Sequence, residues 1–450
     1  MTELLPYQEE GVKAIYGFRG RVLQADQMGL GKTIMSLSWI SRIPKHRPVV
    51  IICPASMKYT WQAEARMHFR MRAEVLEGHC NGTNQLPGDI VILNYDILGS
   101  WLPLLLRSRP RCVVIDECQF IKSLRAKRTK HTLKLVQGVP SVLALSGTPL
   151  TNRPIELWPI LKAVRPDLFP SLEKFAWRHC KPRWTFWGWK FDGATHLGEL
   201  NRTLRRECMI RRLKKDVLLQ LPPKRRKFVC FRLGKSAQKI YDEAQSDFLR
   251  WLEKQSPAKA HRASKSEALV KIGYLVRLAA RLKLDWTTRW IADFFEANPG
   301  EKLVTFTMHT FVIDHLKEKF PDRCVIIDGR VTGRKREESV RQFRSHRKKD
   351  LLLGNWIAAG VGLTLTSASN VAGLDLPWTP GELLQGEDRI HRIGQKKISL
   401  IHYLIAMGTI EEKQINIQRR KAKILDAVLD GRQSAADLDI FSTLLEELKA

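Results

Sequence analysis

The sequence predicts an α/β fold with two lobes, each built on a mostly parallel β-sheet. Short runs rich in β-branched residues alternate with stretches of helical periodicity, a pattern typical of parallel strands buried on both faces. Two such series occur, one in the first third of the chain and one from about residue 301, and only the first contains a glycine-rich loop. The strands expected in the first series lie near residues 48–53, 89–93, 112–115 and 141–145.

The second series predicts strands near residues 302–307, 324–328, 351–353, 371–374 and 399–405. Residues 157–212 and 240–298 have largely helical patterns, and we interpret them as one insertion per lobe. Pro222 and Pro223 are the best candidate for a hinge. We therefore expect a first lobe over residues 1–222, with its insertion at about 155–215, and a second over residues 223–450, with its insertion at about 240–298. Two lobes that share one such loop indicate a ligand cleft between them.

The glycine-rich loop has the composition of a phosphate-binding loop and consists of Asp26, Gln27, Met28, Gly29, Leu30, Gly31, Lys32 and Thr33. Its two glycines let the backbone turn so that amide N–H groups face phosphate oxygens at the start of a helix. Lys32 can reach the β- and γ-phosphates of a nucleoside triphosphate, and the Thr33 hydroxyl can hold Mg²⁺. Asp26 stands where the strict pattern has a glycine, so the loop alone does not decide the function.

Two adjacent carboxylates follow the strand expected at residues 112–115. A buried parallel strand would deliver them to the carboxyl edge of the sheet. Asp116 is the candidate Mg²⁺ ligand, and Glu117 is the candidate base that orients and deprotonates an attacking water. A strand followed by a solvated acidic turn is the alternative. Because phosphoryl transfer needs a phosphate cradle and an acid together, the combination predicts hydrolysis of a nucleoside triphosphate.

The charge of the chain predicts a polyanionic partner. The sequence contains 76 Lys and Arg against 46 Asp and Glu, a formal net charge of +30, which exceeds what solubility requires. Residues 205–227 hold ten Lys or Arg against two acids, and residues 323–349 hold ten against three. We expect both segments to track phosphates, with a merely solvated basic face as the alternative for each.

Cysteine usage predicts a reducing compartment, and hydropathy predicts a chain that does not span a membrane. The eight cysteines are scattered without a CxxC pair, which favours neither a disulfide framework nor a zinc site. The first residues lack the basic and apolar pattern of a signal peptide, and no apolar run reaches the roughly 18 residues of a membrane helix. We expect no membrane partner and a cytoplasmic location, or a nuclear one in a eukaryote.

The order of motifs resembles that of the Swi/Snf-type DNA-dependent ATPases of helicase superfamily 2, over about residues 4–448. The similar segments are residues 5–8, 26–33, 52–56, 116–119, 145–150, 209–216 with 221–224, 303–316, 360–366 and 385–395. The resemblance implies two RecA-like lobes with a nucleotide cleft between them, ATP and Mg²⁺ as cofactors, and double-stranded DNA as partner of a monomer. Residues 175–217 look closest to the annealing-helicase branch, which implies branched or forked DNA. A motor without attached domains suits a bacterium or its virus.

The resemblance also implies roles for individual residues. Gln8 would read the adenine edge, and Gln385 in the last motif would help to bind the nucleotide. Arg392 would be the arginine finger at the γ-phosphate, with Arg389 as second choice. Coupling of hydrolysis to DNA would involve Ser146, Thr148, Gly362 and Gln119. Gln119 departs from the family, which usually has histidine there, so the expectation is preserved hydrolysis with altered coupling. Gln27 often corresponds to glutamate in the family, and its side chain is expected to point away from the phosphates.

An aromatic segment predicts a hairpin around a glycine. Alternation would place Trp187, Trp189 and Phe191 on one face and Trp184 and Phe186 on the other. One face can pack on the lobe while the other stacks on an unpaired base, and core packing alone is the favoured interpretation.

The favoured function is an ATP-driven motor that moves along double-stranded DNA, with remodelling or reannealing of branched DNA as its use. A strand-separating DNA or RNA helicase is the alternative in the same class, and the tryptophan-rich hairpin is its most wedge-like feature. A nucleotide-gated DNA clamp or adaptor with slow hydrolysis is the alternative from another class, supported by Gln119 alone.

Overall fold

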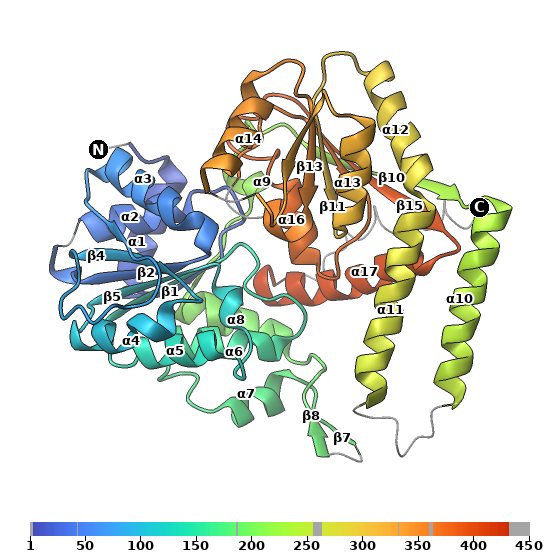
Figure 1. The fold of residues 1–450 in the computed structure, drawn as a ribbon. Helices are drawn as coiled ribbons and strands as arrows, with labels where there is room; N and C mark the ends of the chain where they lie inside the picture. Colours follow the sequence, from blue (N-terminus) through green and yellow to red (C-terminus); the bar gives the residue numbers. More distant parts are fainter. Residues whose placement is uncertain are drawn as a thin grey trace. The chain divides into compact units, whose positions relative to one another are not determined.

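The computed structural model describes residues 3–42, 44–185, 188–254, 263–331, 333–359 and 363–431. These residues form two compact α/β units, drawn in Figure 1. Unit 1 comprises residues 3–221 together with 421–431, and unit 2 comprises residues 222–420. None of the helices within the described ranges has the length and apolar content needed to cross a bilayer.

Unit 1 is built on a seven-stranded parallel sheet with the order β3-β4-β2-β5-β6-β1-β9. The strands are β1 (Arg21–Gln24), β2 (Val49–Cys53), β3 (Glu74–Val75), β4 (Ile90–Asn94), β5 (Cys112–Asp116), β6 (Ser141–Leu145) and β9 (Met209–Ile210). The four strands expected from apolar runs are confirmed. β1, β3 and β9 were not predicted, because runs of two to four residues carry too little periodicity to be recognised.

Helices cover both faces of this sheet, as two apolar clusters show. One cluster joins α1 (Pro6–Gly17), α2 (Lys32–Ser41) and α3 (Lys58–Phe69) to the sheet. The other joins α4 (Leu98–Arg107), α5 (Lys127–Leu135), α6 (Trp158–Val164), α7 (Leu172–His179) and α8 (Leu197–Glu207). Strands such as β2 are buried at every position, which explains why they appear in the sequence as continuous apolar runs. The short helix α9 (Lys214–Val217) follows β9.

Unit 2 is built on a six-stranded parallel sheet with the order β10-β15-β14-β11-β13-β12. Its strands are β10 (Lys224–Arg232), β11 (Leu303–Thr307), β12 (Cys324–Ile327), β13 (Leu351–Asn355), β14 (Asn370–Gly373) and β15 (Ser399–Met407). The five expected strands are confirmed. The edge strand β10 was missed because its first four residues, Lys224 to Lys227, are all basic.

The helices of unit 2 pack on both faces of its sheet. They are α10 (Lys235–Lys254), α11 (Ala263–Leu282), α12 (Leu284–Ala297), α13 (Thr310–Lys319), α14 (Gly333–Ser345), α15 (Trp356–Ala359), α16 (Pro380–Glu387) and α17 (Ile410–Leu429). Side chains of α11, α12 and α13 belong to one cluster, and those of α14, α15, α16 and the start of α17 belong to another. The end of α17 belongs to unit 1, where Leu425, Val428 and Leu429 join its core.

The aromatic segment forms the hairpin of β7 (Arg183–Thr185) and β8 (Gly188–Lys190), but its faces differ from the expectation. Trp184 is paired directly with Trp189 across the two strands, so the two rings share a face. The prediction that they lie on opposite faces was wrong, because alternation was counted through the turn instead of across the pair. Phe186 and Trp187 lie outside the described residues.

Candidate nucleotide site

Three neighbouring strands of unit 1 bring the predicted loop and carboxylates to one edge of the sheet. In the sheet register Gln24 at the end of β1 lies beside Leu145 at the end of β6, and Leu145 lies beside Asp116 at the end of β5. Because all three strands run in parallel, the segments that follow them start at the same level. These segments are the glycine-rich loop, the Ser146 to Thr148 turn and Glu117.

The loop has the backbone geometry for which its glycines were singled out. Gly29 and Gly31 have φ values of 81° and 83°, in the left-handed region that favours glycine. A Cβ on Gly31 would lie 2.4 Å from Nε2 of Gln8. The loop delivers the chain directly into α2, whose first amide N–H groups form an anion-binding end together with the positive pole of the helix.

Lys32 lies at the first position of α2 and folds back over the loop. Its Nζ donates to the carbonyl oxygens of Asp26, at 2.7 Å, and of Gln27, at 3.4 Å. Burial lowers the pKa of Lys32, although the carboxylates of Glu117, Asp26 and Asp116 oppose this effect. Thr33 follows it and is half-buried. An anionic ligand at this helix end would offer the ammonium a better partner than two carbonyls.

Asp116 is a buried carboxylate held by neutral groups. Its Oδ2 accepts a hydrogen bond from Nε1 of Trp61 at 2.8 Å, and its Oδ1 accepts from the Glu117 amide at 3.0 Å. Burial and the neighbouring Glu117 raise the pKa of Asp116 to about 7. None of the ion pairs found among the described residues includes Asp116 or Glu117. A divalent cation would therefore stabilise the ionised forms of these two adjacent carboxylates.

Glu117 and Gln119 are joined by a hydrogen bond of 2.7 Å from Nε2 of Gln119 to Oε2 of Glu117. Oε1 of Gln119 and Oγ1 of Thr148 are buried without a hydrogen-bond partner in the described chain. Buried polar atoms of this kind normally have partners, so these two atoms indicate a site for a polar ligand. The Thr148 amide donates to Oγ of Ser146 at 3.0 Å, which fixes the turn after β6.

The turn after β6 packs directly on the glycine-rich loop. A Cβ on Gly147 would lie 2.4 Å from Cγ of Met28 and 3.0 Å from its amide nitrogen. Met28 itself is buried at this contact. The phosphate loop is therefore in direct contact with the turn that carries Ser146 and Thr148, the residues to which the resemblance assigns coupling.

Asp26 has a structural role that the glycine pattern did not suggest. Its side chain is fully buried and accepts three hydrogen bonds from Arg212: from the backbone amide at 2.8 Å, from Nε at 3.1 Å and from Nη2 at 2.5 Å. Arg212 also donates to the carbonyl of Tyr7 and lies over its ring. Asp26 thus anchors the start of the loop to the chain after β9.

Arg211, the preceding residue, was not singled out in the sequence. Its Nη1 donates to the carbonyls of Ala25, at 2.8 Å, and Gly147, at 3.2 Å. Its Nε pairs with Oδ1 of Asp430 at 2.8 Å, just beyond the end of α17. Arg211 therefore joins the residue before the phosphate loop, the turn after β6 and the residue after α17. No local pattern reveals this residue, because its partners lie up to 219 positions away.

Gln8 and Gln27 are both engaged within unit 1. Oε1 of Gln8 accepts from the Leu5 amide at 3.0 Å, and its Nε2 lies 3.4 Å from the carbonyl of Leu30. Gln8 therefore lies against the glycine-rich loop. Oε1 of Gln27 accepts from the Lys214 amide at 2.7 Å, so this side chain is directed toward the start of α9.

The predicted residues of the last motif lie in unit 2. Arg389 is buried and donates to the carbonyls of Gln385, at 3.0 Å, and Leu363, at 3.1 Å. Arg392 is half-buried, and its Nη1 donates to Oγ1 of Thr364 at 2.8 Å and to the Leu363 carbonyl at 3.2 Å. Both guanidinium groups thus contact residues 363–364. Gly362 lies outside the described residues.

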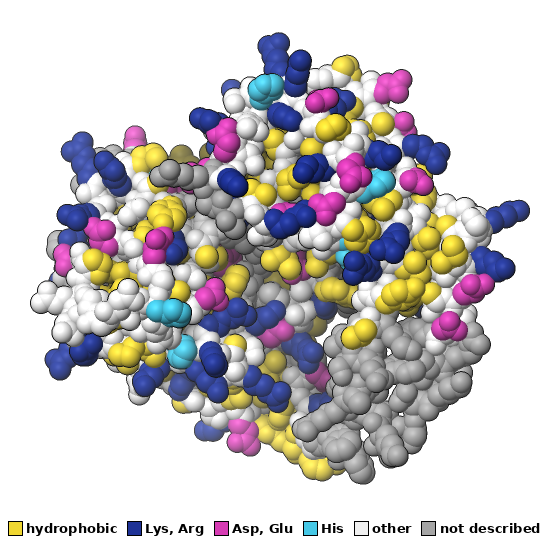
Figure 2. Space-filling model, in the orientation of Figure 1, with side chains coloured by type: hydrophobic (Ala, Val, Ile, Leu, Met, Phe, Trp, Pro, Cys, Tyr) yellow, Lys and Arg dark blue, Asp and Glu magenta, His cyan; other side chains and the backbone are white. Residues whose placement is uncertain are grey.

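Some of the predicted phosphate-tracking cations have internal partners instead. Lys224 and Arg226 in β10 both pair with the buried Glu387, at 2.6 Å. Arg211 and Arg212 in the same basic segment are committed to Asp430 and Asp26. Charge counting could not reveal this, because the acids lie far away in the sequence. Elsewhere Lys and Arg side chains outnumber Asp and Glu on the face shown in Figure 2.

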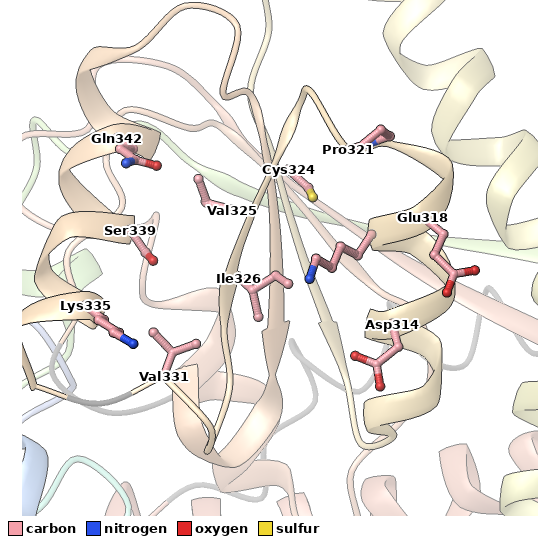
Figure 3. Close-up of a pocket in the computed structure, with 11 residues that line it drawn as sticks. Asp314, Glu318, Pro321, Cys324, Val325, Ile326, Val331, Lys335, Ser339 and Gln342 are labelled. Atoms are coloured by element: carbon pink, nitrogen blue, oxygen red, sulfur yellow. The ribbon is translucent and has the colours of Figure 1, made fainter.

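A surface hollow of about 710 Å³ lies in unit 2 between α13, β12 and α14. Figure 3 shows its side chains, which mix acids such as Asp314 and Glu318 with lysines such as Lys335. It contains none of the residues predicted to bind a nucleotide. No group of three or more metal-ligating side chains occurs within the part of the chain that the structure covers. Mg²⁺ does not require one, because it is commonly held by one or two protein groups plus phosphates.

In unit 1 a glycine-rich loop leads from the end of one parallel strand into a helix, and an acid pair lies at the end of a nearby strand. This arrangement defines unit 1 as a lobe of the P-loop nucleotide-binding class. The SNF2-related domain matches residues 7–285, and the helicase conserved C-terminal domain matches residues 284–394. The chain therefore belongs to the SNF2-related family, and the resemblance based on its motifs is confirmed.

Similar proteins include three curated relatives. The SWI/SNF-related matrix-associated actin-dependent regulator of chromatin subfamily A-like protein 1 of Xenopus tropicalis is 32% identical over 94% of this chain and 45% of its own length. The DNA annealing helicase and endonuclease ZRANB3 of Mus musculus is 33% identical over 96% and 41%. An uncharacterized ATP-dependent helicase of Mycoplasma pneumoniae is 31% identical over 99% and 44%. The chain thus spans less than half the length of these relatives.

Among solved structures, the SWI2/SNF2 ATPase core of Sulfolobus solfataricus in complex with dsDNA is similar, with 24% sequence identity and a TM-score of 0.46. The similarity covers 95% of this chain and 94% of that one.

Proposed function

We propose that this chain hydrolyses ATP to ADP and phosphate and uses the reaction to move along double-stranded DNA. The observation that carries the proposal is the convergence, in register, of the phosphate loop, the acid pair and the turn after β6 at one sheet edge. Membership of the SNF2-related family supports nucleotide use. The names of the relatives, which include a DNA annealing helicase, support action on DNA.

The residues of unit 1 have distinct roles in this proposal. The amides of the loop and Lys32 bind the phosphates, and the glycines keep those amides accessible. Thr33 and Asp116 would hold Mg²⁺, which supplies charge neutralisation at the phosphate oxygens. The raised pKa of Asp116 fits such an ion, as does the absence of an ion pair to this carboxylate among the residues that the structure describes. Glu117 orients the attacking water and accepts its proton.

Double-stranded DNA is the proposed partner because the net charge of +30 favours a polyanion. Binding as a monomer and a preference for branched or forked DNA belong to the same proposal. The roles of Gln385, Arg389 and Arg392 stay predictions from the motif. Arg389 and Arg392 both donate to the Leu363 carbonyl, and Arg392 is the more exposed of the two.

The test is phosphate release measured with single-stranded, duplex and forked DNA and with RNA. Duplex should stimulate turnover most strongly among unbranched ligands. Lys32→Ala should abolish turnover while the far-UV spectrum stays unchanged. Glu117→Gln should bind ATP but hydrolyse it more slowly, on the order of 10²-fold. Equal turnover with and without DNA in the wild type would contradict the motor.

A DNA clamp with slow hydrolysis is the second candidate, favoured by one contact. The 2.7 Å hydrogen bond from Nε2 of Gln119 occupies Oε2 of Glu117, so this oxygen must give up that bond before it can accept a proton from water. On this reading Gln119→Ala would raise basal turnover. For the motor, the same variant should lower duplex stimulation and leave basal turnover close to that of the wild type.

A further inference from the structure

The β7–β8 hairpin of unit 1 is bonded to the neighbouring chain at its base. At its base Arg183 makes a two-bond ion pair with Asp192, at 2.9 and 2.6 Å. The chain on either side is tied together by bonds from the Gly193 amide to the Cys180 carbonyl and from the Thr195 amide to the His179 carbonyl, both 3.1 Å. In Figure 1 the hairpin projects from unit 1 beyond α7. Its described residues are therefore held in place although they extend from the lobe.

Four aromatic rings form a continuous row from the core of unit 1 to this hairpin. Phe191 packs on the core, and Trp177 lies edge-on to it at 5.9 Å between centroids. Trp189 lies 4.5 Å from Trp177, and Trp184 lies 5.3 Å from Trp189, again edge to face. Each contact is a favourable geometry for aromatic pairs, so the row supports its outermost ring.

The outer rings of this row are open to solvent. Trp177, Trp184 and Trp189 are 42%, 68% and 48% exposed. The interpretation of the aromatic segment as core packing alone is therefore wrong for Trp184 and Trp189. Three neighbouring indoles that stay uncovered form an apolar patch of the kind that marks a binding surface.

The charges around the row indicate which ligand fits. Between residues 171 and 192 the sequence holds five cations, Lys174, Arg178, Lys181, Arg183 and Lys190, against two acids, Glu173 and Asp192. Arg178 and Arg183 are paired with Glu199 and Asp192. Lys174 and Lys181 are exposed, and no ion pair between described residues includes either of them. Cations interleaved with exposed aromatic rings are the combination that binds single-stranded nucleic acid, by phosphate contact and base stacking.

We propose that Trp184 and Trp189 stack on unpaired bases of DNA, so that the hairpin recognises a single-stranded segment next to the duplex. In a duplex the face of each base is covered by its neighbours, so an exposed indole can stack only on an unpaired or terminal base. This inference rests on the proposed function, which supplies the duplex, and it assigns the recognition of branched DNA to a surface outside the nucleotide site.

The experiment compares the affinity of the full chain for a blunt duplex and for the same duplex with a single-stranded flap, by fluorescence anisotropy of labelled DNA. Duplex-stimulated ATP turnover is measured in parallel. The variants are Trp184→Ala, Trp189→Ala and Trp184→Tyr. The control is Tyr274→Ala, which removes a ring that is 58% exposed in α11.

The wild type should bind the flapped duplex more tightly than the blunt one. Trp184→Ala should weaken binding of the flapped duplex about tenfold, the size of one lost base stack. It should lower blunt-duplex affinity less, because a blunt duplex offers only the faces of its terminal bases, and it should leave turnover unchanged. Trp184→Tyr should keep most of the preference because it keeps a ring, and Tyr274→Ala should behave as the wild type.

If both alanine variants prefer the flapped over the blunt duplex as strongly as the wild type does, the inference is overturned, and a protein partner becomes the better ligand for the exposed tryptophans. An equal loss of affinity for both DNAs would overturn it as well, because the hairpin would then grip duplex. If the wild type shows no duplex-stimulated turnover, the proposed function fails instead, independently of the flap comparison.

Discussion

The buried pair between Asp26 and Arg212 should hold the phosphate loop in place, and Arg212→Met tests this directly. Methionine keeps the backbone amide bond to Asp26 and much of the alkyl packing, but it removes the two side-chain bonds at 3.1 and 2.5 Å. The Asp26 side chain is 0% exposed, so its carboxylate would remain buried without a cation.

The expected cost follows from that burial. Removing one partner of a buried ion pair costs about 3–5 kcal/mol, because the other charge stays desolvated. For a unit of this size, about 3 kcal/mol corresponds to a fall in melting temperature of roughly 6–12 °C. Asp26→Asn should cost less, about 1–3 kcal/mol, because the side chain of Arg212 is 16% exposed and can gain water.

The assay is thermal unfolding by circular dichroism of the wild type, both single variants and the double variant. The double variant should lose less free energy of unfolding than the two single variants together, and the difference is a coupling energy of about 0.5–3 kcal/mol. The KM for ATP should rise in Arg212→Met, because the Asp26 carbonyl also holds Lys32. A melting temperature within about 2 °C of the wild type, or strict additivity, would refute the reasoning.

Four further outcomes are expected. Arg392→Ala should retain its melting temperature and lose duplex-stimulated turnover by a factor on the order of 10³. Arg389→Ala should lose turnover and also be destabilised, because Arg389 is buried. Normal turnover in both variants would exclude arginine fingers. Asp430→Asn should lower duplex-stimulated turnover about 2- to 30-fold at unchanged DNA affinity. The variant weakens the ion pair that positions Arg211 for its hydrogen bonds to Ala25 and Gly147, and unchanged turnover would show that this positioning does not affect hydrolysis. Burial would raise the pKa of Glu387, but the cations of Arg226 and Lys224 outweigh burial and lower this pKa. The stability that the ionised Glu387 provides is therefore complete above the ordinary carboxyl pKa and is lost as the pH falls toward the pKa of the folded state. The melting-temperature difference between wild type and Glu387→Gln should therefore shrink below about pH 4, and a constant difference would contradict the pair. DNA affinity should fall steeply with salt between about 50 and 200 mM, and a flat dependence would exclude a phosphate-tracking surface.

Much of the candidate site is local in the sequence and was therefore predictable. The two left-handed glycines, Lys32 at the helix start and the acid pair at the end of β5 all depend on residues close to one another along the chain. The continuous apolar runs predicted the central strands, because a parallel strand covered on both faces needs apolar residues at every position. The family resemblance rests on the same local motifs.

Other features depend on pairings between distant residues, which no local pattern contains. β1 is only four residues long and is a strand because it lies between β6 and β9. The basic strand β10 is accommodated because Glu387, some 160 positions later, neutralises Lys224 and Arg226.

The sequence by itself determined the phosphate loop, its acid pair and the parallel α/β class, because glycine conformations, charge and burial periodicity are set by neighbours along the chain. Only the tertiary structure decided that Asp26 is an anchor for Arg212 and that Arg211 reaches Asp430. It also decided that Trp184 and Trp189 share an exposed face. These contacts form when strands pair and helices pack, and their partners are chosen by position in space.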